Sequence, residues 1–248
     1  SEHRLKVSLR SALMLPRLAL GDPDLALDRP PAQTAASGMD ALAQLIEPIV
    51  SRRANPMTDA LCRDGIARAA RALPRAVDNG RDRDARSEMA LAALYSGIAL
   101  ANAGLGAVHG LAGPIGARYG APHGAICAAL LAGVFEANDV QSLEAAGGDF
   151  PSRWKFKEIA QMLTGDPKAE PRDGAVWLRA LAANLRIPGL AVYGVRADHA
   201  PALARLAQAT SSMKGNPVPL SDDVLARIVV AALGSDRRGN RSRLGCWR

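Results

Sequence analysis

The sequence predicts a mainly α-helical protein with a short β segment at its start, and three observations carry this prediction. Ala and Leu supply most of the 48% of residues that are apolar, while aromatic residues make up only 4%. Both residue types favour helices because they lose little side-chain entropy on entering one. From Thr34 onward the apolar residues recur at helical spacing, whereas the preceding residues alternate in polarity or end in turn signals.

The length and composition bound the class of protein. With 248 residues, the chain can bury a substantial core as one large domain or two small ones. Its apolar content, with 22% charged residues, excludes a disordered chain and a disulfide-stapled mini-protein. The cysteines Cys62, Cys127 and Cys246 are odd in number and widely spaced, which suits a reducing compartment, and the first two are expected as small core residues. No signal-peptide layout opens the chain, so we expect a cytoplasmic globular protein.

Two short strands are expected at the start. Leu5–Leu9 alternates apolar with polar residues, and Leu18–Leu20 leads into the turn signature that begins at Gly21. Two such strands cannot form a stable sheet alone. They therefore either pair with each other on a helical body or form the edge of a sheet whose other strands lie outside this chain.

Helices are expected along the rest of the chain. Asn55 and Pro56 provide a start signal, and Pro74 is expected to end the helix that begins there; Ser221 provides a cap for the last helix. The expected helical ranges are 34–50, 55–73, one from about 84 that includes 89–100, 155–163, 173–185, 201–210 and 221–233.

A long stretch between Glu88 and Glu136 contains Arg118 as its only charged residue. Such a stretch suggests either a membrane span or the centre of a large core. Seven glycines in 104–124 and two prolines interrupt it, and these residues break helices in a bilayer. We therefore expect a buried helix, a glycine-rich loop and a second buried helix, with no membrane contact.

The positive charge is concentrated at the end of the chain. Residues 235–248 hold five arginines and one aspartate, a net +4 of the total +7. A basic terminal segment of this kind is typical of a solvated, disordered tail, and no nucleic-acid-binding motif accompanies it. Nucleic acid is therefore not an expected partner.

Four residues are candidates for a metal site. His109 and His123 lie in the charge-poor stretch beside glycines, which allow a ligand to approach the backbone closely. Asp40 and Gln44 are four residues apart on one helix face with apolar neighbours, where a carboxylate needs a cation or hydrogen-bond donors. The plainer interpretation is two core histidines and a first-turn acid after Ser37. Together, two imidazoles, a carboxylate and an amide oxygen would suit Fe²⁺, Zn²⁺ or a similar ion.

Several segments, taken in order, resemble one enzyme family. They include Ala121-Pro122-His123-Gly124 and the glycine-rich run that ends at Gly110. The full set is 15–25, 33–42, 54–60, 101–110, 121–124 and 216–221. In this order they resemble the iron-containing (group III) alcohol dehydrogenases of the dehydroquinate synthase-like superfamily, over about residues 5–233.

The resemblance implies a two-domain enzyme. In this family an N-terminal α/β domain binds NAD or NADP, and a C-terminal all-helical domain holds the metal in the cleft between the two. By this comparison, residues 1–32 would be a strand remnant of the nucleotide domain, 33–234 the helical metal-site domain and 235–248 the basic tail. No glycine-rich phosphate loop follows a strand in this sequence, so NAD or NADP would bind through the domain that is missing here.

The family's four metal ligands fall on Asp40, Gln44, His109 and His123, where the second is normally histidine. A family histidine near the nicotinamide falls on Gly113. The resemblance implies hydride transfer between a small alcohol or aldehyde and NAD(P) by a cytoplasmic homodimer, with this chain inactive by itself. Its catalytic and cofactor-binding residues are not assigned. The alternatives are a maleylacetate reductase-like enzyme and a non-catalytic helical binding or oligomerisation module.

Overall fold

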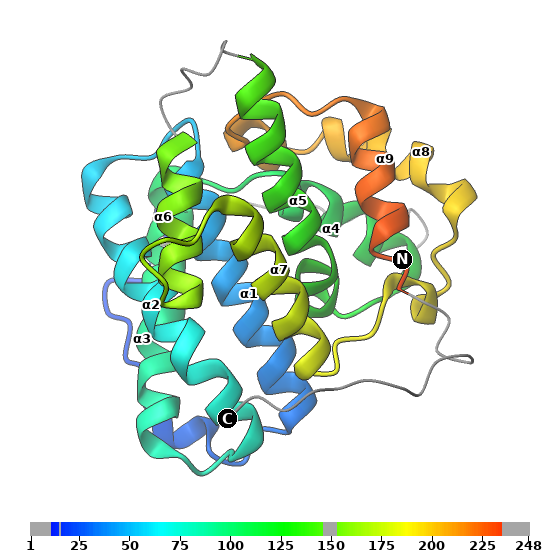
Figure 1. Cartoon of the computed structure of the whole chain (residues 1–248). Helices are drawn as coiled ribbons and strands as arrows, with labels where there is room; N and C mark the ends of the chain where they lie inside the picture. Colours follow the sequence, from blue (N-terminus) through cyan, green and yellow to red (C-terminus); the bar gives the residue numbers. More distant parts are fainter. Residues whose placement is uncertain (1–10, 15, 146–152, 235–248) are drawn as a thin grey trace.

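The computed structural model describes residues 11–14, 16–145 and 153–234. Within these ranges the chain forms nine α-helices, five short 3₁₀-helices and no strand (Figure 1). The α-helices are α1 (Pro31–Val50), α2 (Pro56–Asp78), α3 (Arg83–Ala103), α4 (Ala107–Tyr119), α5 (His123–Ala145), α6 (Arg153–Thr164), α7 (Pro171–Asn184), α8 (Ala200–Gln208) and α9 (Asp222–Ala231). The 3₁₀-helices are η1 (Ala12–Met14), η2 (Pro23–Ala26), η3 (Leu190–Tyr193), η4 (Ala197–His199) and η5 (Ser212–Gly215).

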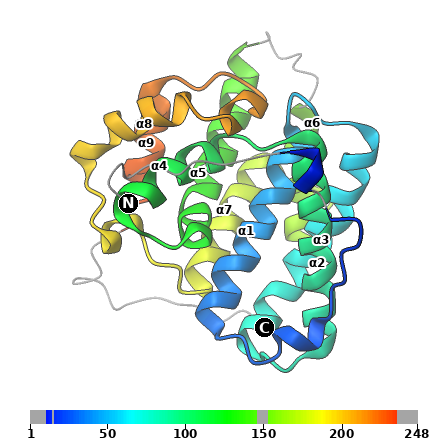
Figure 2. The same ribbon diagram turned by 180° about the vertical axis from the view of Figure 1, so that it is seen from behind.

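The helix α1 is the centre of the molecule. It contacts α2 and α3 on one side and α5 on the other, an arrangement that Figures 1 and 2 show from opposite directions. Its buried residues, which include Met39, Leu42 and Ile49, surround most of the helix. A helix that is apolar nearly all round is stable only inside a core, and this explains the central place of α1.

Every predicted helical range corresponds to a helix of the structure, and the ends agree to within three residues except at the end of α2. The helix α2 continues through Pro74 to Asp78, whereas Pro74 was expected to end it. Proline removes one backbone hydrogen bond inside a helix. The last turn is nevertheless held, because Leu73 and Ala76 are buried and the Asn79 N–H donates to the Arg75 carbonyl.

The expected glycine-rich loop is a third helix. Gly104, with φ 73°, follows the end of α3, and Gly120, with φ 65°, follows the end of α4. These two glycines therefore end helices rather than form a long loop. The α3 helix is also less buried than predicted. It packs through small side chains, including Ala92 and Ala99, whereas Leu91, Leu94 and Ile98 are exposed. Lack of charge therefore did not mean burial here.

The predicted strand Leu18–Leu20 is wrong. These residues have no regular secondary structure, Leu18 and Leu20 are exposed, and η2 follows them. A strand needs a hydrogen-bonded neighbour, and the described part of the chain has none. The predicted strand Leu5–Leu9 and the basic tail 235–248 lie outside the described residues.

The α5 helix is long and apolar enough, by composition, to cross a bilayer, and α3 and α4 together pass the same test with a 100° bend between them. In α5, 56% of the relevant window is buried inside the protein, where the helix contacts α1, α4, α7 and α9. It is thus accounted for as a core helix, and the sequence-based expectation of no membrane contact stays a prediction.

Candidate metal centre

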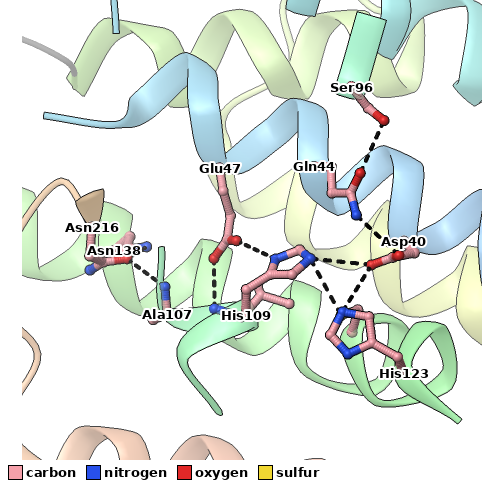
Figure 3. A network of polar contacts seen from close by, with 11 residues as sticks. Asp40, Gln44, Glu47, Ser96, Ala107, His109, His123, Asn138 and Asn216 are labelled. Atoms are coloured by element: carbon pink, nitrogen blue, oxygen red, sulfur yellow. Dashed lines mark hydrogen bonds and ion pairs between the residues drawn. The ribbon is translucent and has the colours of Figure 1, made fainter. Parts of the chain in front are cut away.

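Three helices bring three of the four predicted residues together (Figure 3). Asp40 comes from α1, His109 from the first turn of α4, and His123 is the first residue of α5. The Nε2 atom of His109 lies 3.2 Å from Asp40 Oδ1, and the Nε2 atom of His123 lies 3.8 Å from the same oxygen. Asp40 thus meets two histidines that lie 69 or more positions away in the sequence, which is the convergence that a metal cage requires.

The start of α4 is fixed by side chains from elsewhere in the fold. The N–H of Ala107 donates to Asn216 Oδ1 at 3.0 Å, and the N–H of Val108 donates to Glu47 Oε1 at 2.6 Å. These are among the first N–H groups of a helix, which have no partner within the helix. A side chain at Gly106 would collide with Asn216, since its Cβ would lie 2.7 Å from Oδ1. Glycine at this position therefore lets both caps reach α4 and holds His109 in place.

Glu47 is a site residue that the sequence analysis missed. It is buried, and its Oε2 atom lies 2.6 Å from His109 Nδ1 (Figure 3). A carboxylate on one imidazole nitrogen fixes the ring so that the other nitrogen is presented to a metal ion. Helical spacing could have revealed it, since Asp40, Gln44 and Glu47 stand at i, i+4 and i+7 on one face of α1.

Cys127 also belongs to the site, although it was expected as a core residue without a nearby partner. It is buried, as predicted, but its Sγ atom lies 3.6 Å from His123 Nε2 and 3.8 Å from His109 Nε2. It stands four residues after His123 in the same helix, so the sequence signal for it was an i, i+4 pair. Donor atoms of Asp40, His109, His123 and Cys127 all lie within 4.8 Å of one another.

Gln44 is beside this cluster and bonded to it. Its Nε2 atom donates to Asp40 Oδ2 at 3.1 Å, and its Oε1 atom accepts from the Ser96 hydroxyl at 3.1 Å (Figure 3). The amide nitrogen thus faces Asp40 and the amide oxygen faces Ser96. The role of Gln44 as a metal ligand stays a prediction.

The electrostatics of the site favour a positive charge. Burial by itself lowers the pKa of His109, but the carboxylates of Glu47 and Asp40 outweigh it and raise that pKa well above its usual value. Burial raises the pKa of Asp40, but contact with His109 and the charge of His123 outweigh burial and lower it. The pKa of the Cys127 thiol is raised to about 11, mainly by burial. A metal ion beside Asp40 would be stabilised by the same negative charges that stabilise the His109 imidazolium.

The donor set fits a divalent transition metal. In a tetrahedral zinc site, two N or O donors are about 3.3 Å apart, and an N and an S donor about 3.6 Å apart. The separations here are 3.2 and 3.8 Å for the oxygen–nitrogen pairs and 3.6 and 3.8 Å for the nitrogen–sulfur pairs. The His123 side chain is 35% exposed and that of Asp40 21%, so the cluster is accessible from that side.

Gly113, where the family resemblance predicted a departure from histidine, lies in α4 about one turn after His109. An added Cβ would meet nothing within 4 Å. The position is therefore open and carries no group that could transfer a proton.

Comparisons with known proteins agree with this geometry. The C-terminal model of the Fe-containing alcohol dehydrogenase family matches residues 34–233. Alcohol dehydrogenase 4 of Saccharomyces cerevisiae is 34% identical over 93% of this chain and 58% of its own. Lactaldehyde reductase of Escherichia coli is 38% identical over 82% of this chain and 52% of its own.

A solved structure extends the match to three dimensions. The crystal structure of a 1,3-propanediol oxidoreductase superimposes with a TM-score of 0.76 at 34% identity, covering 85% of this chain and 54% of that chain. This confirms the predicted multi-helical C-terminal fold. The chain spans between about half and three-fifths of the length of these relatives.

Proposed function

Because the chain belongs to the Fe-containing alcohol dehydrogenase family, we propose that it supplies the helical, metal-binding part of an oxidoreductase. The reaction would be hydride transfer between a small alcohol or aldehyde and NAD or NADP. The observation that carries this proposal is the convergence of Asp40, His109 and His123 from three helices on one buried, cation-favouring site. The relatives include a lactaldehyde reductase and a 1,3-propanediol dehydrogenase, which supports a small alcohol or aldehyde as substrate.

The residues of this chain would hold and orient a divalent metal, Fe²⁺ or Zn²⁺. Asp40, His109 and His123 are ligands in this proposal, Gln44 is the predicted fourth, and Glu47 keeps His109 Nε2 directed at the ion. A bound metal would supply Lewis-acid polarisation of the substrate oxygen. Gly113 offers no proton carrier, so proton transfer would fall to water or to groups outside this chain.

The nucleotide would be bound by an N-terminal domain, because the sequence holds no glycine-rich phosphate loop after a strand. We therefore expect the chain by itself to bind metal, not to bind NAD or NADP, and to show no turnover. Assembly as a homodimer and a cytoplasmic location belong to the same proposal and rest on the family resemblance.

Metal content tests the proposal directly. The chain is loaded with Zn²⁺ or anaerobically with Fe²⁺, dialysed and analysed for metal beside Asp40→Ala and His123→Ala. We expect one ion per wild-type chain and little in either variant. His199→Ala is the control, since His199 lies in η4 and bonds to the Arg196 N–H. Unchanged metal content in both site variants would contradict the proposed cage.

A non-catalytic helical module is the second candidate, and the absence of histidine at Gln44 and Gly113 favours it. The two candidates are separated by joining this chain to the nucleotide-binding domain of a relative and measuring NAD(P)-linked alcohol oxidation. Activity that depends on His123 supports an oxidoreductase, including a maleylacetate reductase-like one if that substrate is the one reduced. A folded fusion that binds metal and nucleotide without turnover supports the module.

A further inference from the structure

Cys127 has the position of a metal ligand, while Gln44 has that of a supporting residue. We propose that Cys127 is the fourth protein ligand in place of Gln44, and that the resulting carboxylate, two-imidazole and thiolate set selects Zn²⁺ over Fe²⁺. This inference rests on the metal-binding role proposed above and adds the identity of the fourth donor and the class of metal.

The sulfur atom of Cys127 lies at ligand distance from the other donors of the site. Cys127 Sγ lies 3.6 and 3.8 Å from the two imidazole nitrogens that face Asp40, close to the nitrogen–sulfur spacing of about 3.6 Å in a tetrahedral zinc site. Cys127 and His123 belong to the same helix, so their relative position is set by the backbone of α5 rather than by a flexible loop. The thiol is fully buried and directed at the cluster.

Gln44 directs its amide oxygen away from the cluster. Its amide donates to Asp40 Oδ2 and accepts from Ser96, so turning the amide oxygen toward the cluster would lose the hydrogen bond to Asp40. It would also set that oxygen against the Asp40 carboxylate. Gln44 instead holds one oxygen of Asp40 and leaves the other, Oδ1, facing both imidazoles. It is thus a positioning residue for Asp40.

The types of donor atom in this set favour Zn²⁺. Thiolate is a soft ligand that favours Zn²⁺ and Co²⁺, and Zn²⁺ binds nitrogen and sulfur donors more tightly than Fe²⁺ does. On binding, the S–H bond breaks, the sulfur–metal bond forms and the proton leaves to solvent, with no change of oxidation state. The site then has four protein ligands without Gln44, and a substrate oxygen would enter as a fifth donor.

Cobalt provides the test, because thiolate–Co²⁺ bonds give an intense near-ultraviolet charge-transfer absorption. The metal-free chain is titrated with Co²⁺ and its spectrum and bound cobalt are measured together. We expect the band in the wild type and in Cys62→Ala/Cys246→Ser, where Cys127 is the only cysteine left. Gln44→Ala should also keep it. Cys127→Ser should lose the band and bind Zn²⁺ about tenfold or more weakly, with its helical circular dichroism unchanged.

A competition between Zn²⁺ and Fe²⁺ under anaerobic conditions measures the selectivity. We expect Zn²⁺ to be preferred by the wild type and the preference to fall in Cys127→Ser. Cobalt bound without the band in the single-cysteine chain would overturn the thiolate ligand while leaving the metal site intact. Absence of bound metal altogether would overturn the proposed function instead. If Cys127→Ser does not fold, the single-cysteine spectrum still decides.

Discussion

Glu47 fixes the orientation of one residue of the candidate metal site, His109. Its two carboxylate oxygens bond the His109 ring and the Val108 N–H, so one side chain fixes both the imidazole and the start of α4. A buried carboxylate of this kind is tolerated because both of its oxygens are paired.

The substitution Glu47→Gln should weaken metal binding. Gln can still accept from the Val108 N–H but brings no charge to the His109 ring, and loss of such a partner typically costs about 10–100-fold in metal affinity. A chelator competition measures the change. Glu158→Gln is the control, since Glu158 pairs with Arg63 on the surface. Equal affinity for wild type and Glu47→Gln would contradict the role of Glu47.

Metal affinity should rise with pH. The raised pKa of His109 means that this ring holds a proton more tightly than an isolated imidazole does, and a metal ion that binds Nε2 must displace it. Each displaced proton strengthens the apparent affinity by about tenfold per pH unit until the pH exceeds that pKa. Chelator competition between pH 6 and 8 measures the slope, and a flat profile would contradict the prediction.

At the scale of elements, the close approach of α5 to α1 places His123 beside Asp40. Gly124 makes this approach possible, because a Cβ there would lie 2.2 Å from the carbonyl oxygen of Ala36. That atom belongs to the α1 backbone and cannot turn aside as a side chain does. The position of one glycine therefore controls the geometry of the metal centre.

Gly124→Ala should separate the two helices. We expect a loss of about 1–3 kcal/mol in the free energy of unfolding, together with weaker metal binding because His123 moves away from Asp40. Gly97→Ala is the matched control. Gly97 is exposed within α3 with open space around it, so alanine there should stabilise by up to about 1 kcal/mol. Chemical denaturation measures the free energy of unfolding of both variants. Equal changes in the two variants would contradict the predicted clash at Gly124.

At the scale of the whole molecule, an apolar stripe lies on the outer face of α3. Leu91, Leu94 and Ile98 stand at i, i+3 and i+7 and are 37%, 41% and 38% exposed. Grouped apolar side chains on a surface mark contact sites or aggregation risk. The chain spans little more than half the length of these relatives.

Replacing all three residues of the stripe with serine should reduce the exposed apolar surface of the chain and its tendency to aggregate. We expect lower fluorescence of a dye that binds exposed apolar surface and greater solubility. These three side chains are more exposed than the small residues through which α3 packs on the core, so dye binding rather than the unfolding transition is the readout. A matched triple substitution of the buried Ala92, Ala99 and Ala103 by serine should unfold the chain more readily. Unchanged dye binding in the stripe variant would contradict this expectation.

Most of the helices, and three of the residues that meet in the candidate metal site, could be predicted from the sequence by itself. Apolar spacing and caps such as Asn55 are local features, and α2 shows the cap as expected. Asp40, His109 and His123 stood out as candidate metal ligands by their residue types and neighbours, and the order of motifs indicated the family. The strand Leu18–Leu20 failed because a strand depends on a neighbour that no local pattern specifies.

Only the tertiary structure decided which side chains complete the site. Cys127 and Glu47 look like ordinary helical residues until α1, α4 and α5 pack together, and Gln44 turned its nitrogen rather than its oxygen to Asp40. The same holds for the uncharged α3, whose exposed stripe depends on which of its faces meets α1. Periodicity fixes the direction of a side chain relative to its own helix, whereas distances between helices are set by packing across the core.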